Sequence, residues 1–442
     1  MLAFKGIRRK ELGPDPARVV DVGLPPKLLV ALRQQRAVTC QPTVKEGDKV
    51  VGGQVLAASE DPPARIYSPT SGTIEGLATT VDPHGQEVEA LVLAADGKDE
   101  WAEASAVVAG AHQVGELGRE RILEQITQLG LVRFGQVGSL LAEELSPPKA
   151  PAGYLPHTGT PVAKAIDTLI IKAVDHDPPV NPNQAAAYAY CEALIVGIKA
   201  LEVATGAERV VVAGWSLPEE LKGAVEESGW ELVELNPARY PFALDPLVVW
   251  QVTKREVPVA YGRPQDVGVA IVPAVSAAEL GTGLTTGRAP VERVLPVVGD
   301  VYTPGLYRLR LGSPVEVAIE AAGGFKGAPG KVLAGGPMMG LGLYELGAPI
   351  TAEVEGIYVI GEERLKSFAD HACIHCGACV RACPVGLVPA EIAKFCEFGR
   401  FEDAAQVNLM WCVECGCCAY VCPARRPMVQ LIRLGKYRLL AS

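Results

Sequence analysis

Two cysteine runs near the C-terminal end carry the most specific chemistry in the sequence. The first begins at Cys373 and reads CIHCGACVRACP, and the second begins at Cys412 and reads CVECGCCAYVCP. Each run is C-x2-C-x2-C-x3-C-P, the bacterial-type ligand pattern for [4Fe–4S] clusters. Three thiolates, each one tight turn apart, bind three irons of a cube, and the fourth iron needs a cysteine from elsewhere. The runs therefore predict two [4Fe–4S] clusters.

The spacing also predicts which cysteines bind which cluster. In two-cluster domains the fourth cysteine of each run ligates the cluster of the other run. Cys417 and Cys418 are adjacent, so one of them is spare, and the three-residue rhythm selects Cys418 as the ligand. The alternative is zinc, whose sites usually show two well separated C-x2-C pairs, a pattern that these runs fit poorly. The predicted sets are Cys373, Cys376, Cys379 and Cys422 for the first cluster, and Cys412, Cys415, Cys418 and Cys383 for the second.

Composition limits the class of protein. With 442 residues the chain is expected to form two to four domains. A net charge of −10 argues against a nucleic-acid binder, and no apolar run reaches the roughly 18–20 residues of a membrane span. All cysteines except Cys40 and Cys191 lie after residue 370, which indicates metal or redox chemistry in a reducing compartment. We expect a cytoplasmic protein, either free or peripheral on the cytoplasmic face of a membrane complex.

The elements that position the cysteines are predicted to form a multidomain α/β and α+β protein. After an N-terminal arm (1–29), residues 30–100 show short strands with glycine turns and resemble the barrel-sandwich hybrid fold of biotinyl and lipoyl domains. The matching hairpin tip, Pro69–Gly72, has no lysine to modify, which favours structural packing over a carrier role. Residues 346–442 are predicted to form an α-helical ferredoxin-like domain that holds both clusters.

Two further domains are predicted between these. Residues 113–290 place buried strands at 166–174, 209–213 and 267–272, alternating with helical stretches such as 186–204, which is typical of a Rossmann-like α/β domain. Residues 291–345 resemble a β-grasp module of the soluble-ligand-binding (SLBB) type. They end in a glycine-rich loop, GGPMMG at 335–340, which we interpret as a tight connection in preference to a phosphate-binding loop.

The tail CIHCGACVRACPVGLVP…FEDAA…CVECGCCAYVCPARRPMVQLIRLGK and the segment GDVYTPGLYRLRLGSPVEVAIEAAGGF…PGKVLAGGPMMG resemble the C subunit of the Rnf ferredoxin–NAD electron-transport complex. The order of modules matches as well, so the resemblance covers nearly the whole chain. It implies an α/β domain similar to the flavin-carrying subunit of respiratory complex I. That domain would bind FMN and NADH, and the clusters would pass electrons between flavin and membrane subunits.

The chain departs from the family's flavin motifs in four places. The loop G-x-G-G-x-G-F-P reads GLVRFGQVG, and the strand end N-G-A-E-C-E-P reads KAVDHDP. The family runs N-V-G-T and Y-P-x-G-A-E read Pro273–Ser276 and Tyr240–Asp245. Side chains replace glycines where backbone must approach a cofactor, although the sequence leaves open that Arg133 and Lys172 bind its phosphate. The residues that remain as a degenerate FMN site are Gly130, Gly135, Gly138, Asp175 and Asp177.

We therefore expect an iron–sulfur protein that relays single electrons between a redox partner and another oxidoreductase subunit. Its partners would be other redox proteins or subunits, such as a ferredoxin or a flavoprotein. The alternative is an FMN-dependent NADH oxidoreductase subunit, which the altered motifs disfavour, and a third is an adaptor with structural clusters. A basic group near the C-terminus is either a solvated helix face or a docking surface for an acidic partner; it comprises Arg425, Arg426, Arg433, Lys436 and Arg438.

Overall fold

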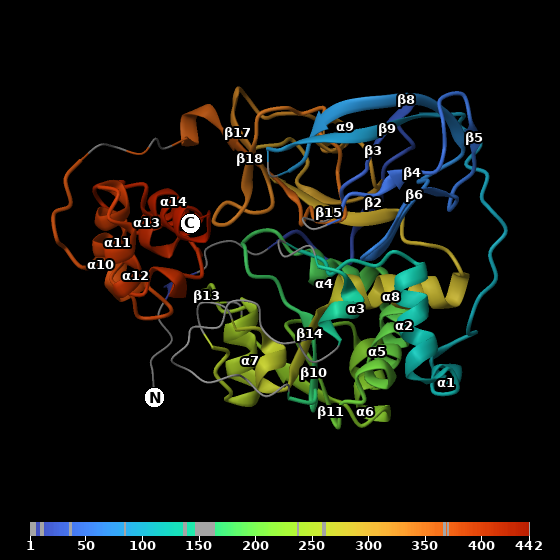
Figure 1. Ribbon diagram of the computed structural model, residues 1–442, viewed down its shortest axis with the longest axis horizontal. Coiled ribbons are helices and arrows are strands. Elements are labelled where there is room, and N and C mark those ends of the chain that lie inside the picture. Colours follow the sequence, from blue (N-terminus) through green and yellow to red (C-terminus); the bar gives the residue numbers. More distant parts are fainter. Residues whose placement is uncertain are drawn as a thin grey trace.

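The computed structural model describes residues 6–8, 13–34, 38–83, 85–135, 139–145, 164–236, 238–258, 262–365, 368 and 371–441. Gly138, one of the residues predicted for the flavin site, lies outside them. An α/β unit packs beneath a barrel-sandwich unit and a β-grasp sheet, and a small helical unit with the C-terminus stands at one end (Figure 1). This is the mixed architecture predicted from the sequence, except that the strand Ile357–Gly361 belongs to the β-grasp sheet and not to the helical domain predicted to begin at residue 346.

The short apolar runs after the N-terminal arm form the barrel-sandwich unit. It has two antiparallel sheets, with strand orders β3-β9-β8-β5 and β4-β6-β7. Alternate side chains of the strands point inward, where Leu28, Leu56, Ile74 and Leu93 form a core. The strands are β3 (Lys27–Ala31), β4 (Gln41–Pro42), β5 (Lys49–Val50), β6 (Val55–Glu60), β7 (Pro63–Tyr67), β8 (Gly72–Val81) and β9 (Glu87–Ala95).

The hairpin tip of this unit is packed into the protein. The hydroxyls of Thr70 and Ser71 donate to Asp99 and Asp96 at 2.8 and 2.7 Å, and both side chains are buried. Arg310 of the β-grasp sheet donates to the Pro69 carbonyl at 3.1 Å. The tip therefore joins two units, in agreement with the structural interpretation of its lysine-free sequence.

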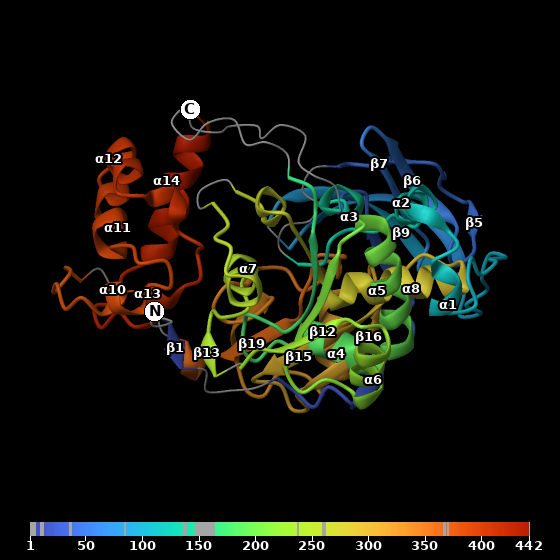
Figure 2. The same cartoon turned by 90° about the horizontal axis from the view of Figure 1, so that it is seen from below.

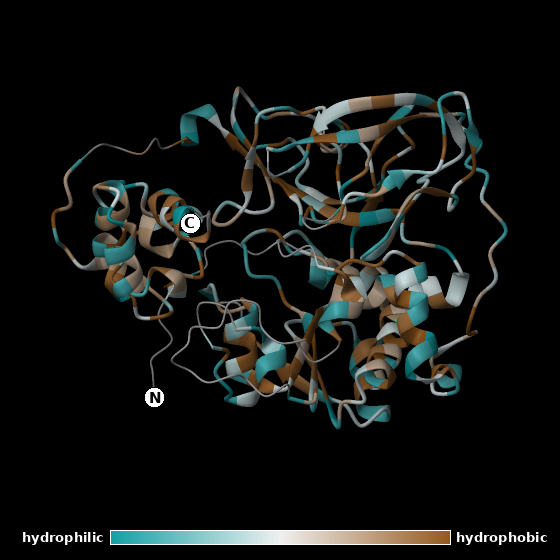
Figure 3. Cartoon of the chain, in the orientation of Figure 1, coloured by the Kyte–Doolittle hydropathy of each residue, from teal (hydrophilic) through white to brown (hydrophobic). Residues whose placement is uncertain are grey.

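The α/β unit is built on four parallel strands in the order β12-β11-β10-β14. Near-continuous apolar runs form the central strands because helices cover both faces of the sheet, and these strands are coloured mostly as apolar in Figure 3. The chain leaves β10 toward β11 and later returns to β14 on its other side, so the connections reverse direction between β10 and β14. In such sheets this switch point, at the carboxyl ends of the strands, is the usual ligand crevice. The strands are β10 (Thr168–Ala173), β11 (Arg209–Gly214), β12 (Glu231–Glu234) and β14 (Val269–Pro273).

The helices of the α/β unit differ from the prediction in one place. The expected single helical stretch at 186–204 is two helices that meet at Tyr190, whose backbone is not helical (φ −132°, ψ 40°). Helices α5 and α8 cross in direct contact, since a Cβ on Gly197 would lie 1.8 Å from the Ala277 carbonyl oxygen. The helices are α1 (Ala111–Val114), α2 (Gly118–Gln128), α3 (Leu141–Glu144), α4 (Pro182–Ala189), α5 (Cys191–Thr205), α6 (Glu219–Glu227), α7 (Asp245–Thr253) and α8 (Ala274–Thr286).

The β-grasp unit is a six-stranded sheet in the order β18-β17-β19-β15-β16-β2, with helix α9 (Val315–Ala321) packed on it. The predicted glycine stop follows α9, since Gly323 and Gly324 have φ of 82° and 83°. The N-terminal arm contributes the edge strand β2 here and pairs β1 with β13 of the α/β unit. The strands are β1 (Ile7–Arg8), β2 (Val19–Asp21), β13 (Arg239–Tyr240), β15 (Glu292–Gly299), β16 (Gly305–Arg310), β17 (Pro329–Ala334), β18 (Leu341–Leu343) and β19 (Ile357–Gly361).

The C-terminal unit is helical and stands beside β1 and β13 (Figure 2). Apolar faces of α11, α12 and α14 meet in a small core around Ile392, Leu409 and Ile432. Within the described part of the chain, no helix is both long and apolar enough for a membrane crossing. The helices are α10 (Ala378–Ala382), α11 (Pro389–Glu397), α12 (Phe401–Gln406), α13 (Cys417–Tyr420) and α14 (Met428–Ala441).

Candidate iron–sulfur site and the adjoining cleft

The two cysteine runs fold into matching loops. Cys412 lies 39 positions after Cys373 (412 − 373), and the same offset relates the left-handed residues of the two loops. Positive φ is uncommon for residues other than glycine, so its recurrence shows that both loops adopt one backbone path. The left-handed pairs are His375 and Glu414 (54° and 55°), Gly377 and Gly416 (69° and 75°), and Gly386 and Arg425 (75° and 50°).

The second predicted set of cysteines is gathered and buried. Cys383 comes from the first run, yet it packs in one core cluster with Cys412 of the second. Burial raises the pKa of the Cys383 thiol, and the nearby Cys415 raises it further. Burial likewise raises the pKa of Cys418, with added contributions from Cys412, Cys415 and Cys383. The four cysteines of the predicted second set therefore lie near one another, and Cys417 lies near three of them as well.

The first predicted set is closer to solvent. Cys379 packs with Cys422 of the second run, and Cys373 contributes to its raised pKa. Cys376 is exposed, and the Arg381 guanidinium donates to its carbonyl at 3.1 Å. The two sets thus differ in environment, because three of the four cysteines of the second set are buried and only one of the first set is.

The donor set suits iron–sulfur chemistry. The backbone N–H of Leu387 donates to Cys383 Sγ at 3.3 Å, and that of Glu414 donates to Cys412 Sγ at 3.4 Å. Such N–H groups stabilise thiolate sulfur and tune cluster potentials, while iron offsets the raised thiol pKa values by binding the thiolate. Among the described residues, no three His, Cys, Asp or Glu side chains converge on a point that could hold a single ion. A cubane has a separate iron for each thiolate, so its ligands do not meet at one point.

The other cysteines and most of the basic group have protein partners. Cys40, Cys191 and Cys396 are buried in apolar cores, as their isolated positions indicate. Arg433 and Lys436 both donate to Glu414 at 2.8 Å, and Arg426 pairs with Glu397. Three of the five basic residues therefore have partners within their own domain, and two carboxylates serve the three.

Tyr240 anchors the helical unit to the α/β unit. Its side chain is fully buried in a cluster with Met339, Cys415 and Cys417, and its hydroxyl donates to the Cys415 carbonyl at 2.6 Å. The Cys417 thiol faces the Tyr240 carbonyl at 4.0 Å. Cys417 thus reaches the domain contact, and its thiol also lies close to Cys415, Cys418 and Cys383.

The glycine-rich loop at 335–340 lies between the α/β unit and the C-terminal helical unit. The backbone N–H groups of Met338 and Met339 donate to the Asp177 carboxylate, at 3.1 and 2.7 Å to its nearer oxygen atoms. On its other side, a Cβ added to Gly416 would lie 2.9 Å from the Met338 carbonyl oxygen. A carboxylate of the chain therefore occupies the N–H groups that a phosphate would need, which agrees with a tight connection.

Charged side chains fill the switch point of the α/β sheet. Lys172, at the end of β10, donates to Asp245 at 2.7 Å, and Arg133 donates to the other carboxylate oxygen of Asp245. Arg133 and Lys172 are 4% and 6% exposed, so this is a buried ion-pair network. Burial opposes ionisation of Asp245, but Arg133 and Lys172 hold its pKa well below the usual range. The two cations therefore pair with the Asp245 carboxylate. The sequence had left open that they bind a phosphate.

The remaining residues of the predicted flavin site also contact protein. A Cβ on Gly130 would lie 2.4 Å from the Arg65 carbonyl oxygen, and one on Gly135 would lie 2.8 Å from Glu355 Oε1. Asp175 accepts hydrogen bonds from the backbone and side-chain N–H groups of Asn183, both at 2.9 Å, at the start of α4. Each described residue of the predicted flavin site therefore packs against, or hydrogen-bonds to, another part of the chain.

Family models match three parts of the chain. Residues 7–98 match the RnfC barrel sandwich hybrid domain, 294–342 match the SLBB domain, and 372–425 match a 4Fe-4S dicluster domain. The C subunit of the ion-translocating oxidoreductase complex of Rhodobacter capsulatus is 30% identical over 429 residues, which cover 94% of this chain and 78% of that protein. The chain belongs to the RnfC family. It is accordingly an iron–sulfur electron-transfer protein, with its chemistry in the C-terminal dicluster domain.

Another member of the RnfC family is similar over most of its length. The C subunit of the proton-translocating ferredoxin:NAD(+) oxidoreductase complex of Clostridium ljungdahlii is 29% identical over 417 residues, covering 93% of this chain and 87% of that protein. Among solved structures, a chain of an NAD+-reducing [NiFe]-hydrogenase in the H2-reduced state superimposes with a TM-score of 0.47 at 16% identity. That alignment covers 75% of this chain and 64% of the hydrogenase chain.

The sequence did not reveal the role of two acidic residues near the switch point of the α/β sheet. Asp245 was noted only as a departure from a motif, and Glu355 was not noted. The Glu355 side chain is 12% exposed, and its carboxylate lies 3.7 Å from His176 Nε2 and beside Gly135. The signal for Asp245 was present, because a lysine and an arginine had appeared at two other altered motifs, and buried cations require a counter-charge.

Glu355 makes the folded protein sensitive to pH. Burial raises its pKa to about 8, and Asp177 and Asp175 oppose its ionisation further, against Lys172 and Arg133. The unfolded chain loses this proton near pH 4.3, so the stabilisation is complete below about pH 4.3 and disappears as pH rises through about 8. We expect Glu355→Gln to be more stable than wild type at pH 8 and to lose the advantage at pH 5. Anaerobic denaturant midpoints would measure this, with the exposed Glu363→Gln as control; equal shifts at both pH values would contradict it.

Proposed function

We propose that this chain relays single electrons between a redox partner and another subunit of an oxidoreductase complex. The observation that carries the proposal is the placement of Cys383 from one run among the cysteines of the other. When bound, [4Fe–4S] clusters supply one-electron chemistry at potentials tuned by their surroundings. The proposed ligands are Cys373, Cys376, Cys379 and Cys422 for one cluster, and Cys412, Cys415, Cys418 and Cys383 for the other.

Redox partners would approach the side of the helical unit that carries Cys376. This cysteine is exposed, and the neighbouring Ile374 is 66% exposed, whereas Cys383, Cys415 and Cys418 are buried. The interior set faces Tyr240 and the α/β unit instead. Since electron transfer between proteins requires a short path from surface to surface, the exposed set is the side suited to exchange with a partner.

The partners follow from the family. Relatives carry names that describe subunits of ion-translocating complexes, and one of these names includes ferredoxin and NAD(+). By this likeness, the chain would associate with other subunits of such a complex and occupy a peripheral position on the cytoplasmic face of the membrane. A ferredoxin or a flavoprotein subunit would be the direct partner in exchange.

The α/β unit would act as a scaffold without bound FMN. The Arg133–Asp245–Lys172 network occupies the sheet's switch point, and Asp175 and Asp177 are committed to protein N–H groups. Binding a flavin there would require breaking a buried ion-pair network, which is strongly unfavourable. The chain's own fold therefore supports an electron relay over an FMN-dependent NADH oxidoreductase.

Anaerobic visible spectroscopy of the purified chain tests both proposals. We expect a broad absorption toward the blue end of the visible spectrum from [4Fe–4S] clusters, which dithionite bleaches and NADH leaves unchanged. Acid extraction would release no flavin. Flavin bands with bleaching by NADH alone would overturn the scaffold proposal, whereas centres that dithionite does not reduce would overturn the relay itself.

A further inference from the structure

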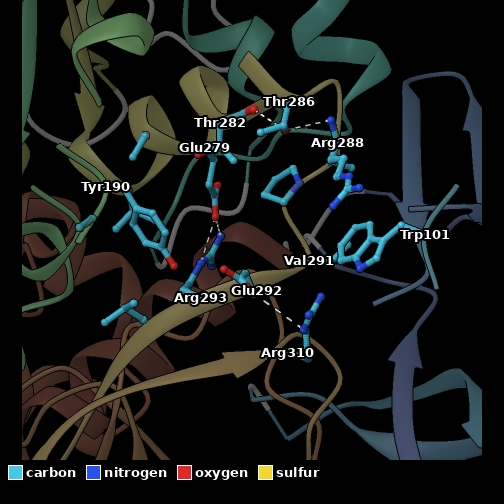
Figure 4. A pocket seen from close by; sticks show the side chains of 16 residues that line it. Trp101, Tyr190, Glu279, Thr282, Thr286, Arg288, Val291, Glu292, Arg293 and Arg310 are labelled. Atoms are coloured by element: carbon cyan, nitrogen blue, oxygen red, sulfur yellow. Dashed lines mark hydrogen bonds and ion pairs between the residues drawn. The ribbon is translucent and has the colours of Figure 1, made fainter. Parts of the chain in front are cut away.

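A cavity of about 300 Å³ lies where three units of the protein meet. Helix α8 forms one wall and the start of β15 with the end of β16 forms another, while the rings of Tyr190 and Trp101 flank it from opposite sides (Figure 4). The described residues that line it include none of the proposed cluster ligands and no member of the Arg133–Asp245–Lys172 network. Ligand sites favour such junctions between domains and combine an apolar lining with a few polar groups.

Most charged groups of this cavity are paired. Glu279 is buried and accepts from the Arg293 guanidinium, whose Nε lies 3.1 Å from its Oε1. Arg310 donates to Asp99 at 2.8 Å and also lies over the Trp101 ring. These pairs tie the cavity walls together and need no further partner.

Two charged side chains of the cavity make no hydrogen bond among the residues that the structure describes, although Glu292 forms ion pairs with two arginines. Arg288 is exposed at the rim with its guanidinium carbon 4.6 Å from the centre of the Trp101 ring, and across the described ranges no carboxylate pairs with it. The Glu292 carboxylate has Arg308 and Arg310 nearby, at 3.8 and 3.9 Å, which exceeds hydrogen-bonding distance. The cavity therefore presents a cation and an anion, each with hydrogen-bonding atoms that no described side chain uses, beside an apolar wall.

We propose that this cavity binds a small zwitterion with an apolar side chain, of the size and chemistry of an α-amino acid. Its carboxylate would pair with Arg288, and its ammonium group would donate to Glu292. The apolar side chain would contact Val275, Ala278 and Val291, which line the wall between them. Because the walls come from three units, an occupied cavity would also hold these units together. This site is independent of the proposed electron relay.

Three probes of matched shape test the proposal by isothermal titration calorimetry on the full chain. L-phenylalanine carries both charged groups, 3-phenylpropanoate lacks the ammonium, and 2-phenylethylamine lacks the carboxylate. We expect saturable binding of phenylalanine and affinities at least about ten-fold lower for the other two, since a charge-assisted hydrogen bond contributes this much or more. Phenylalanine should also raise the thermal unfolding midpoint, because it binds the folded state alone.

Variants at the two available charges locate the binding. Arg288→Gln and Glu292→Gln each keep a polar side chain at a partly exposed position, and each should lower the affinity for phenylalanine by about ten-fold or more. Arg438→Gln, at an exposed position of α14, is the matched control and should bind as wild type does. Absence of saturable binding, equal binding of 3-phenylpropanoate, or binding unchanged in both variants would each overturn the proposal.

Discussion

Replacing Cys418 by serine is expected to lower the iron content from about eight atoms per chain to about four, because one of two [4Fe–4S] clusters loses a ligand. The expectation rests on the position of Cys418 beside Cys412, Cys415 and Cys383. A structural cluster contributes to folding, so the variant should also unfold at a lower temperature. Iron analysis, the visible spectrum and calorimetry of anaerobic protein would measure these effects.

The adjacent cysteine is a matched control for this experiment. Cys417→Ser introduces the same change one position away, at a thiol that faces Tyr240, and should retain both clusters. Cys383→Ser adds a sharper condition, because it lies in the first run but should reproduce the spectrum of Cys418→Ser. Loss of iron in Cys417→Ser with retention in Cys418→Ser would contradict the assignment. A Cys383→Ser spectrum that matches a Cys376→Ser spectrum instead would contradict the crossing.

Asp245→Asn is expected to lower the free energy of unfolding of the α/β unit by about 3–5 kcal/mol, because it leaves two buried cations without a counter-charge. Arg133 and Lys172 are nearly inaccessible to water and both donate to this carboxylate. The Asp245 side chain itself is 21% exposed, so water reaches it more readily than the two cations that it neutralises. Denaturant titration under anaerobic conditions, followed by Trp230 of the same unit through fluorescence, would measure the change.

Two controls show whether burial causes that loss. Asp403→Asn breaks an exposed ion pair with Arg400, whose side chain is 59% exposed, and should change stability by less than about 1 kcal/mol. Arg133→Met in the Asp245→Asn background removes one uncompensated cation and should recover part of the loss. If Asp245→Asn proved as mild as Asp403→Asn, the buried network would not be structural.

The cluster cysteines could be predicted because their geometry is local. Residues three apart lie one tight turn apart on any such loop, and the repeated Cys-Pro end marks the exchange of fourth ligands. The strands of the α/β unit were predictable for a similar reason, since buried parallel strands appear as continuous apolar runs, as at Thr168–Ala173. Tyr190 was not recognisable as a helix break, because its side chain contacts an arginine of the distant strand β16.

The ion-pair network at the switch point could be predicted only in part, because its members are far apart in sequence. Arg133 and Asp245 are separated by 112 positions, and no local pattern joins them. Each altered residue alone predicts a lost cofactor contact. That the losses compensate one another, with two cations and one carboxylate forming a single network, required the fold. The link between Asp177 and the loop at 335–340 was hidden for the same reason, since 162 positions separate it from Met339.

The pairing of β2 with β16 sets an order on the assembly of this chain. Asp21 and Arg308, which form an ion pair across these strands, are 287 positions apart, so the ribosome releases the first long before it makes the second. During that interval the N-terminal edge strand has no neighbour, although the barrel-sandwich strands that follow it can already pair among themselves. The arm is therefore inserted late, as a closing strand, and newly made chains truncated before residue 305 would expose it to misassembly.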